Sequence, residues 1–163
     1  MPISTSSIVI PDLDSVHDSA RIPLGTRVTL SDGGEAVFCL AASGVAQYNG
    51  VVIGVDYIAE GLATAAVADG SGIGKQIGWA QTSCASGKYC WIQTSGRPKG
   101  KLATDCADRV TLFTTAVSGV LDDATISAAL VAGVVSKTTI SNATAITLMV
   151  PTGAFIFPFA NPA

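Results

Sequence analysis

Short apolar runs alternate with clusters of turn-forming residues along most of the chain. The apolar runs include RVTL, EAVFCLAA, VVIGVDYI, KYCWIQT, RVTLFTTA and ITLMV, and the intervening clusters include SDGG, SG, AEG and DGSG. Runs of this length and spacing are typical of the strands of a sandwich or barrel. The pattern therefore predicts a mainly β protein, with a single compact β-sandwich or β-barrel domain at residues 25–150.

One segment leaves helix and strand both open. The stretch DDATISAALVAGVV, residues 122–135, begins with acids that suit a helix start, and Ile126, Leu130, Val131 and Val134 recur at helical spacing. Gly133 and the paired valines favour a strand instead. No long helix is indicated elsewhere.

The two ends differ in texture from the middle. Residues 1–24 contain three prolines and scattered acids, with SIVI as their one apolar run, and we expect an extended N-terminal arm. Residues 151–163 form an extended, apolar Phe/Pro-rich C-terminal tail, in which Phe155, Phe157 and Phe159 share one side. Pro158 lacks a backbone donor, which argues against a central strand. The tail either folds back on its own core or docks on a neighbour, and the three phenylalanines are the predicted assembly contacts.

Composition adds an argument about partners. Of 163 residues, 13% are charged and 6% are aromatic, so the chain is too apolar for disorder and has few charges to keep its surface wet. Part of the surface is therefore expected to be covered in an assembly. A net charge of −3 argues against nucleic acid. The longest uncharged apolar run is too short to span a membrane, and no signal peptide is indicated.

A glycine-rich loop raises the question of phosphate binding. The stretch ADGSGIGKQIGWAQ, residues 68–81, places Lys75 after three glycines. A Walker loop requires glycine at position 69, where the chain has Asp69, and a hydroxyl at position 76, where it has Gln76. The dinucleotide fingerprint fails as well. A turn between strands is the prediction, with no cofactor. The basic cluster at residues 97–101 is likewise predicted to be a solvated hairpin loop.

Catalytic and metal-binding groups are sparse. The single histidine, His17, lies in the expected arm among Asp12, Asp14 and Asp18, without an elbow for a nucleophile or a calcium loop. The pairs Asp122–Asp123 and Asp105/Asp108 do not indicate a glycosidase, since adjacent acids on a strand point apart. We therefore expect no catalytic residue and no metal.

The remaining candidates are cysteines and tryptophans. Cys39, Cys84, Cys90 and Cys106 form no C-x-x-C pair, so buried free thiols are expected. Cys84 and Cys90 flank a probable hairpin, and a disulfide between them is the alternative. Trp79 and Trp91, expected to be cross-strand neighbours, belong either to the core or interface or to a sugar-stacking platform.

The sequence of residues 25–150 resembles small β-rich virion proteins of tailed double-stranded DNA bacteriophages. The resemblance is carried by IGWAQTSCASGKYCWIQTSG, by CADRVTLFTTAVSGVLDD and by SNATAITLMV, and it is greatest to the head decoration, or cement, class. It implies a protein that is not an enzyme and that binds the major capsid protein on the outer head surface. It also implies a homo-oligomer, with a trimer favoured, made in the host cytoplasm and carried on the virion.

A tail or fibre adhesin is the alternative function. Such a module would bind host glycans through exposed aromatic side chains, and Trp79, Trp91 and Tyr89 are the available set. A small hydrolase is disfavoured, because the chain offers neither a placed base nor a placed nucleophile.

Overall fold

The computed structural model describes residues 12–63, 75–124, 130–136, 145–151 and 153–157, and every regular element in these ranges is a β-strand. The first seven strands are β1 (Val16–His17), β2 (Arg27–Thr29), β3 (Glu35–Ala41), β4 (Gly50–Ile53), β5 (Ile58–Gly61), β6 (Gln76–Ala80) and β7 (Tyr89–Gln93). The others are β8 (Lys99–Leu102), β9 (Leu112–Thr114), β10 (Val120–Asp122), β11 (Leu130–Ala132), β12 (Val135–Ser136), β13 (Ala145–Met149) and β14 (Ala154–Phe157).

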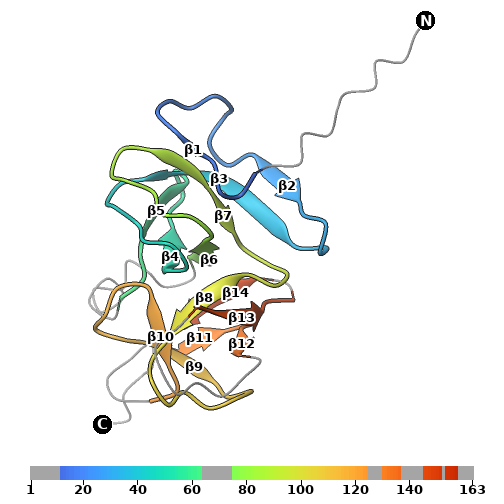
Figure 1. Cartoon of the computed structure of the whole chain (residues 1–163), viewed down its shortest axis with the longest axis vertical. Helices are drawn as coiled ribbons and strands as arrows, with labels where there is room; N and C mark the ends of the chain where they lie inside the picture. Colours follow the sequence, from blue (N-terminus) through green and yellow to red (C-terminus); the bar gives the residue numbers. More distant parts are fainter. Residues whose placement is uncertain (1–11, 64–74, 125–129, 137–144, 152, 158–163) are drawn as a thin grey trace, which may run out of the picture.

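Strands β3 to β7 close into a five-stranded barrel, in the upper part of Figure 1. β3 pairs in parallel with β5, β5 pairs with β4, and β4 pairs with β6. β6 then pairs with β7, and β7 returns to β3, so the ring is complete. β2 pairs with β3 and β1 pairs with β7, which places both early strands against the barrel.

The barrel contains two copies of one structural unit. Residues 37–53 and residues 76–92 show the same succession of strand, bend, single bridge, turn and strand, shifted by 39 positions. The units pair with each other through equivalent contacts: Cys39 lies opposite Cys90 in the β3–β7 ladder, and Gly78 lies opposite Val51 in the β6–β4 ladder. The bridging residues of the two units, Val45 and Cys84, pair with each other through two hydrogen bonds of 2.8 Å. The barrel is therefore pseudo-twofold.

The turn of each unit is bonded to the strand end of the other. Tyr48 N donates to Ala80 O at 2.6 Å, and at the equivalent place Gly87 N donates to Ala41 O at 2.8 Å. Both turn residues have positive φ, 64° at Tyr48 and 75° at Gly87. A type II turn requires positive φ at its third residue, which glycine adopts without strain and tyrosine does not. The same backbone therefore forms from unlike side chains.

The remaining strands form an open sheet of order β14-β11-β9-β10-β8-β13-β12, in the lower part of Figure 1. β14 joins it to the barrel. It pairs with β11 on one edge and with residues 76 and 77 of β6 on the other. One edge of β6 pairs with β4 along residues 76–79, and the other edge pairs with β14 at residues 76–77 and with β7 at residues 79–80. The two bodies are therefore continuous through hydrogen bonds.

The core has three parts. The barrel interior is filled by small and aliphatic residues, among them Val37, Cys39, Val51, Cys90 and Ile92. One outer face of the barrel packs on the open sheet in the largest cluster, whose members include Val52, Leu62, Ile77, Trp79, Leu102, Leu112, Leu121 and Leu148. The other outer face, with Ala36, Phe38 and Trp91, is covered by apolar residues from the segment 13–30.

The prediction of a mainly β fold with a barrel is confirmed. In the segment left open between helix and strand, residues 130–132 and 135–136 are strands, and residues 125–129 lie outside the description. The basic cluster is not a solvated loop, because residues 99–102 form β8, which pairs with β10 and β13. Its Gly100 and Leu102 are buried, so the segment alternates between core and solvent.

The two ends were expected to be extended. Residues 1–11 and 158–163 lie outside the description, and residues 12–24 run along the barrel. The argument from Pro158 against a central strand was wrong, because β14 has a partner on each edge. Its ladder ends at Phe157, one residue before the proline, so the missing donor does not interrupt it. The domain boundaries at residues 24 and 150 stay predictions.

Candidate functional site

The predicted assembly contacts fall on β14 and beyond it. Phe155 pairs with Gln76 on one edge and Ala132 on the other, and Phe157 pairs with Leu130. Phe159 lies outside the described residues. The backbone of β14 therefore holds the barrel to the open sheet within one chain. A contact of these phenylalanines with another protein stays a prediction.

The aromatic set required for sugar stacking is not exposed. Trp79 is 0% and Trp91 is 6% accessible, and only Tyr89 of the three is half-buried. The tryptophans are not direct cross-strand partners either. Trp79 lies opposite Gln93 and packs towards the open sheet, whereas Trp91 lies opposite Phe38 on the other outer face, with ring centroids 5.3 Å apart. The core interpretation of both tryptophans is confirmed.

The contacts of His17 are of the kind that stabilise a fold. It lies in β1, its Nε2 is 3.3 Å from Ser15 Oγ, and its ring is 5.9 Å from that of Phe38. The neighbouring Asp18 forms an ion pair with Lys88 at 2.8 Å, which lowers the pKa of Asp18 and raises that of Lys88. These contacts tie the segment before β2 to the turn before β7, and they bring no buried acid to His17.

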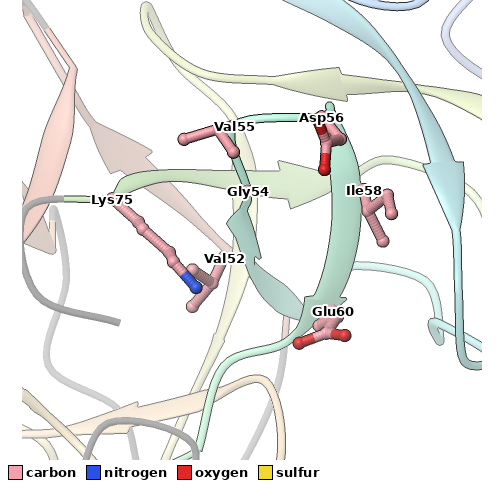
Figure 2. Close-up of a pocket in the computed structure, with 7 residues that line it drawn as sticks. All are labelled: Val52, Gly54, Val55, Asp56, Ile58, Glu60 and Lys75. Carbon is pink, nitrogen blue, oxygen red and sulfur yellow. The ribbon is translucent and has the colours of Figure 1, made fainter. Parts of the chain in front are cut away.

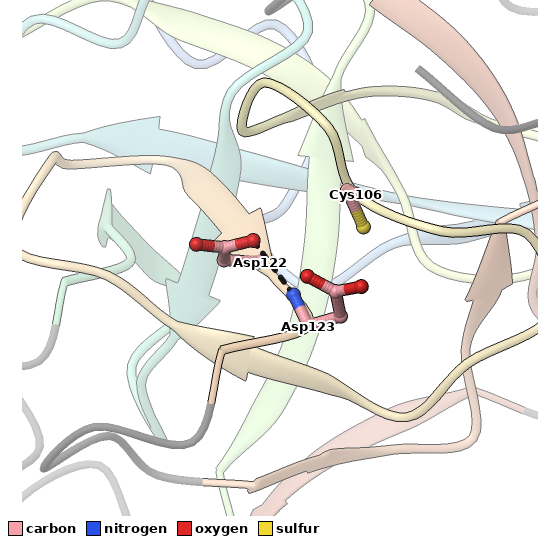
Figure 3. Close-up of side chains that lie close together, drawn as sticks. All are labelled: Cys106, Asp122 and Asp123. Carbon is pink, nitrogen blue, oxygen red and sulfur yellow. Dashed lines mark hydrogen bonds between the residues drawn. The ribbon is translucent and has the colours of Figure 1, made fainter. Parts of the chain in front are cut away.

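The closest group of potential metal ligands joins Cys106 to Asp122 and Asp123. One ligand atom of each lies within 4.8 Å of the others (Figure 3). The parallel pairing of β8 with β10 brings the segment after β8 beside the end of β10. Asp123 already lies beyond the strand, so the two acids converge, contrary to the expectation that they point apart. The sequence carries no signal for this cluster, because Cys106 lies 16 positions before Asp122 in the chain.

The bonds within this cluster are structural. Asp122 Oδ1 accepts from Asp123 N at 2.8 Å, and Asp123 Oδ2 accepts from Ala107 N at 3.0 Å. Burial raises the pKa of Asp122, and burial together with the two carboxylates raises the pKa of Cys106 to about 11. A thiol with so high a pKa is protonated at neutral pH and is a poor nucleophile. The cluster therefore fastens the segment around residue 107 to β10.

A hollow opens between β4, β5 and the residue before β6. It has a volume of about 210 Å³ and is lined by Val52, Gly54, Val55, Asp56, Ile58, Glu60 and Lys75. Figure 2 shows the Lys75 side chain reaching towards Val52. Ligand pockets enclose about 300–1,000 Å³ and bury most of the ligand, so this hollow is small for a ligand site.

The glycine-rich loop lies mostly outside the described residues, which resume at Lys75. Lys75 is followed directly by strand β6, whereas a phosphate-binding loop runs into a helix. The prediction of a turn at residues 68–74 itself falls outside the description.

All four cysteines are free and buried, as expected, and no disulfide joins Cys84 to Cys90 in this structure. Asp108 pairs with Arg109 at 3.4 Å, so this acid is also held in a local contact. Of the titratable side chains singled out from the sequence, Cys106, Asp122 and Asp123 lie together, Cys39, Cys84 and Cys90 share the barrel interior, and His17 lies apart from both groups. They are not gathered in one cleft of the described structure.

Comparisons with known proteins add no relative: no family model, no curated protein and no solved structure matches the chain. In the part of the chain that the structure describes, no helix is long and apolar enough to cross a membrane.

Proposed function

We propose that this protein is a non-enzymatic structural component of a tailed-phage virion, which decorates and stabilises the head by binding the major capsid protein on its outer surface. The proposal rests on one observation: a stretch of sequence that resembles the head decoration class forms part of the barrel. The run from Ile77 to Gly96 forms most of β6, the turn at residues 85–88 and β7, so it supplies two of the five barrel strands. This run of the resembling sequence thus builds part of the barrel scaffold, which supports a structural role.

The distribution of the polar groups supports the same proposal. Asp32 accepts from the backbone of Gly34 and Arg97, and Asp123 accepts from Ala107. These carboxylates stabilise loops, where each hydrogen bond to a charged group contributes about 1.5–3 kcal/mol. A chain with few charges that commits several of them to its own loops is suited to a rigid building block.

Repetition supplies the affinity in this proposal. Many equivalent positions on a head lattice turn weak single contacts into strong overall binding, and a homo-oligomer, with a trimer favoured, multiplies them again. The burial of Trp79 and Trp91 removes the stacking set on which the adhesin alternative depended.

The first test is the copy number of this chain in purified particles of its parent virus, measured by quantitative mass spectrometry against the major capsid protein. We expect a fixed ratio corresponding to hundreds of copies per particle. A handful of copies, or none, would overturn the assignment to the head surface.

A second test addresses the contact residues. Purified full-length chain is added to heads that lack it, and bound protein is measured after sedimentation. Phe159→Ser should weaken binding, whereas Val55→Ser, at an apolar side chain that is 89% exposed on the turn between β4 and β5, is the matched control. Equal binding by the two variants would remove Phe159 from the contact.

A further inference from the structure

Three of the four cysteines belong to the barrel interior. Cys39, Cys84 and Cys90 are all members of the interior cluster, where their neighbours are mainly valine, isoleucine and alanine. Cys39 lies opposite Cys90 in the β3–β7 ladder. Cys84 forms the single bridge to Val45, immediately before the turn at residues 85–88 that leads into β7. A short turn thus carries one thiol at its start and another just after its end.

Cys84 and Cys90 are in direct contact. The thiol of Cys90 donates a hydrogen bond to the sulfur of Cys84, which lowers the pKa of Cys84 and raises that of Cys90. Burial raises the pKa of Cys39 to about 12, so this third thiol stays protonated. Of the three, Cys84 is therefore the first to form a thiolate, with Cys90 already positioned against it.

The pseudo-twofold barrel shows what these positions need for packing. Val45 and Val51 occupy the places in the first unit that Cys84 and Cys90 occupy in the second, and both valines belong to the same interior cluster. A pair of valines thus fills the equivalent space with the same turn and the same ladder. Packing at these two places therefore does not require sulfur, and the thiols add a chemistry that the first unit lacks there.

The pair lies just beneath solvent. Cys84 is 2% and Cys90 is 0% accessible, but residues 85–87, which follow Cys84 directly, are exposed. The turn is held by Gly87 N donating to Ala41 O at 2.8 Å, by Ala41 N donating to Lys88 O at 2.9 Å and by Ser86 Oγ donating to Ala42 O at 2.7 Å. Local opening of an exposed turn requires less free energy than unfolding of the barrel, and it is the route by which an oxidant would reach Cys84.

We propose that Cys84 and Cys90 are a thiol–disulfide exchange pair, which small disulfides of the glutathione class oxidise to an intramolecular disulfide that locks the turn at residues 85–88. The Cys84 thiolate attacks one sulfur of the oxidant, forming a mixed disulfide and releasing one thiolate. Cys90 then loses its proton to solvent and attacks the Cys84 sulfur, and the second small thiolate leaves. Two protein thiols are oxidised and one small disulfide is reduced to two thiols. The inference does not depend on the proposed virion function.

The test uses the full chain, reduced and then incubated with oxidised glutathione. We expect the number of titratable thiols to fall from four to two and the intact mass to fall by about 2 Da. Peptide mapping without reductant should recover Cys84 linked to Cys90. The melting temperature should rise by about 5 °C, because the bond restricts a short loop in the unfolded chain.

Two variants make the result specific. Cys84→Val combined with Cys90→Val gives the second unit the pair found in the first, and it should fold, keep its mass and show no rise in melting temperature with the oxidant. Cys39→Val should still form the Cys84–Cys90 bond. Recovery of four thiols, of a stable glutathione adduct, or of Cys39 linked to Cys90 in the wild-type chain would overturn the proposal.

Discussion

The two units of the barrel have one backbone and different surroundings. Only Ala41 and Ala80, Ala46 and Ala85, and Ile53 and Ile92 are identical at equivalent positions of residues 37–53 and 76–92. One strand of each unit, β4 and β6, packs on the open sheet, whereas the other strand of each unit, β3 and β7, is covered by residues 13–30. The comparison teaches that equivalent strands, such as β3 and β6, share one hydrogen-bond pattern while their side chains pack on different neighbours.

The largest difference is expected at equivalent positions 40 and 79. Trp79 is fully buried against the open sheet, whereas Leu40 is partly exposed. Trp79→Ala should lower the free energy of unfolding by about 4 kcal/mol, because a large buried ring leaves a cavity. Leu40→Ala should lower it by about 1 kcal/mol, since its side chain is partly solvated already. Urea unfolding measures both.

Trp79→Phe is the control for this pair. The indole Nε1 of Trp79 has no hydrogen-bond partner among the described residues, so its loss removes no bond. The variant should lose less than about 1.5 kcal/mol. Equal losses in Trp79→Ala and Leu40→Ala would mean that the two faces are equally packed.

The next difference lies inside the barrel, at equivalent positions 39 and 78. A Cβ at Gly78 would lie 2.4 Å from Ile92 Cγ2 and 2.9 Å from Gln93 O. Gly78→Ala should therefore lower the free energy of unfolding by about 3 kcal/mol, through overpacking against backbone. Cys39→Ala should cost about 1 kcal/mol, because it removes one buried sulfur. A Gly78→Ala protein as stable as wild type in urea would contradict the close approach of β6 and β7.

A smaller effect is expected at the turns. Gly87 has φ of 75°, and a Cβ there would meet no atom within 4 Å, so Gly87→Ala tests backbone conformation alone. It should lower the free energy of unfolding by about 1 kcal/mol. Gly87→Asn should cost less, since asparagine adopts positive φ more readily. The same loss in both variants would show that the cost does not come from φ.

The smallest effect on stability is expected from the polar contacts at equivalent positions 49 and 88. Asn49 accepts from Lys101 Nζ at 2.9 Å and donates to Ser118 O, so its amide ties the first unit to the segments around β8 and β10. Lys88 ties the second unit to Asp18 through an exposed ion pair. The pKa of Asp18 is lowered in the folded protein, so this contribution is present above its unfolded value of 3.8 and is lost as pH falls through the folded value.

Asp18→Asn should therefore lower the melting temperature slightly near neutral pH, and the difference should disappear as pH falls through the folded pKa of Asp18. The raised pKa of Lys88 sets the upper limit, since the pair is also lost as pH rises through that folded value. A constant difference across the acid range would show that Asp18 acts through something other than its charge.

The sequence predicted the class of fold because strand and turn signals are local. The spacing of apolar runs and glycine clusters around residues 35–53 and 76–93 corresponds closely to β3, β4, β6 and β7. The internal repeat was missed, because equivalent places hold unlike side chains such as Tyr48 and Gly87, and backbone hydrogen bonds leave no trace in composition. The central position of β14 was missed for a related reason. Its partners are residues 76–77 of β6 and residues 130–132 of β11, and no local pattern in the sequence connects them to β14.

For the candidate site residues as well, local features could be predicted from the sequence and tertiary contacts could not. Burial of the cysteines and tryptophans could be predicted from residue type alone. The convergence of Cys106 with Asp122 and Asp123 depends on the parallel β8–β10 pairing, and the contact of Cys84 with Cys90 depends on how one turn closes. The first could not be predicted from spacing, whereas the spacing of Cys84 and Cys90 around a predicted hairpin already indicated that the two thiols lie close together.

The position of β14 has a consequence for the order of folding. Every strand of the barrel lies between Glu35 and Gln93, so the ring can close on a ribosome-bound chain as soon as β7 has emerged. Ala154 pairs with Ile77, a partner 77 positions earlier, and contacts across such long stretches of chain form slowly. The edge of β6 that later pairs with β14, at residues 76–77, must therefore stay unpaired while the open sheet is synthesised. Until β14 arrives, that edge is the part of the nascent chain most open to pairing with another molecule.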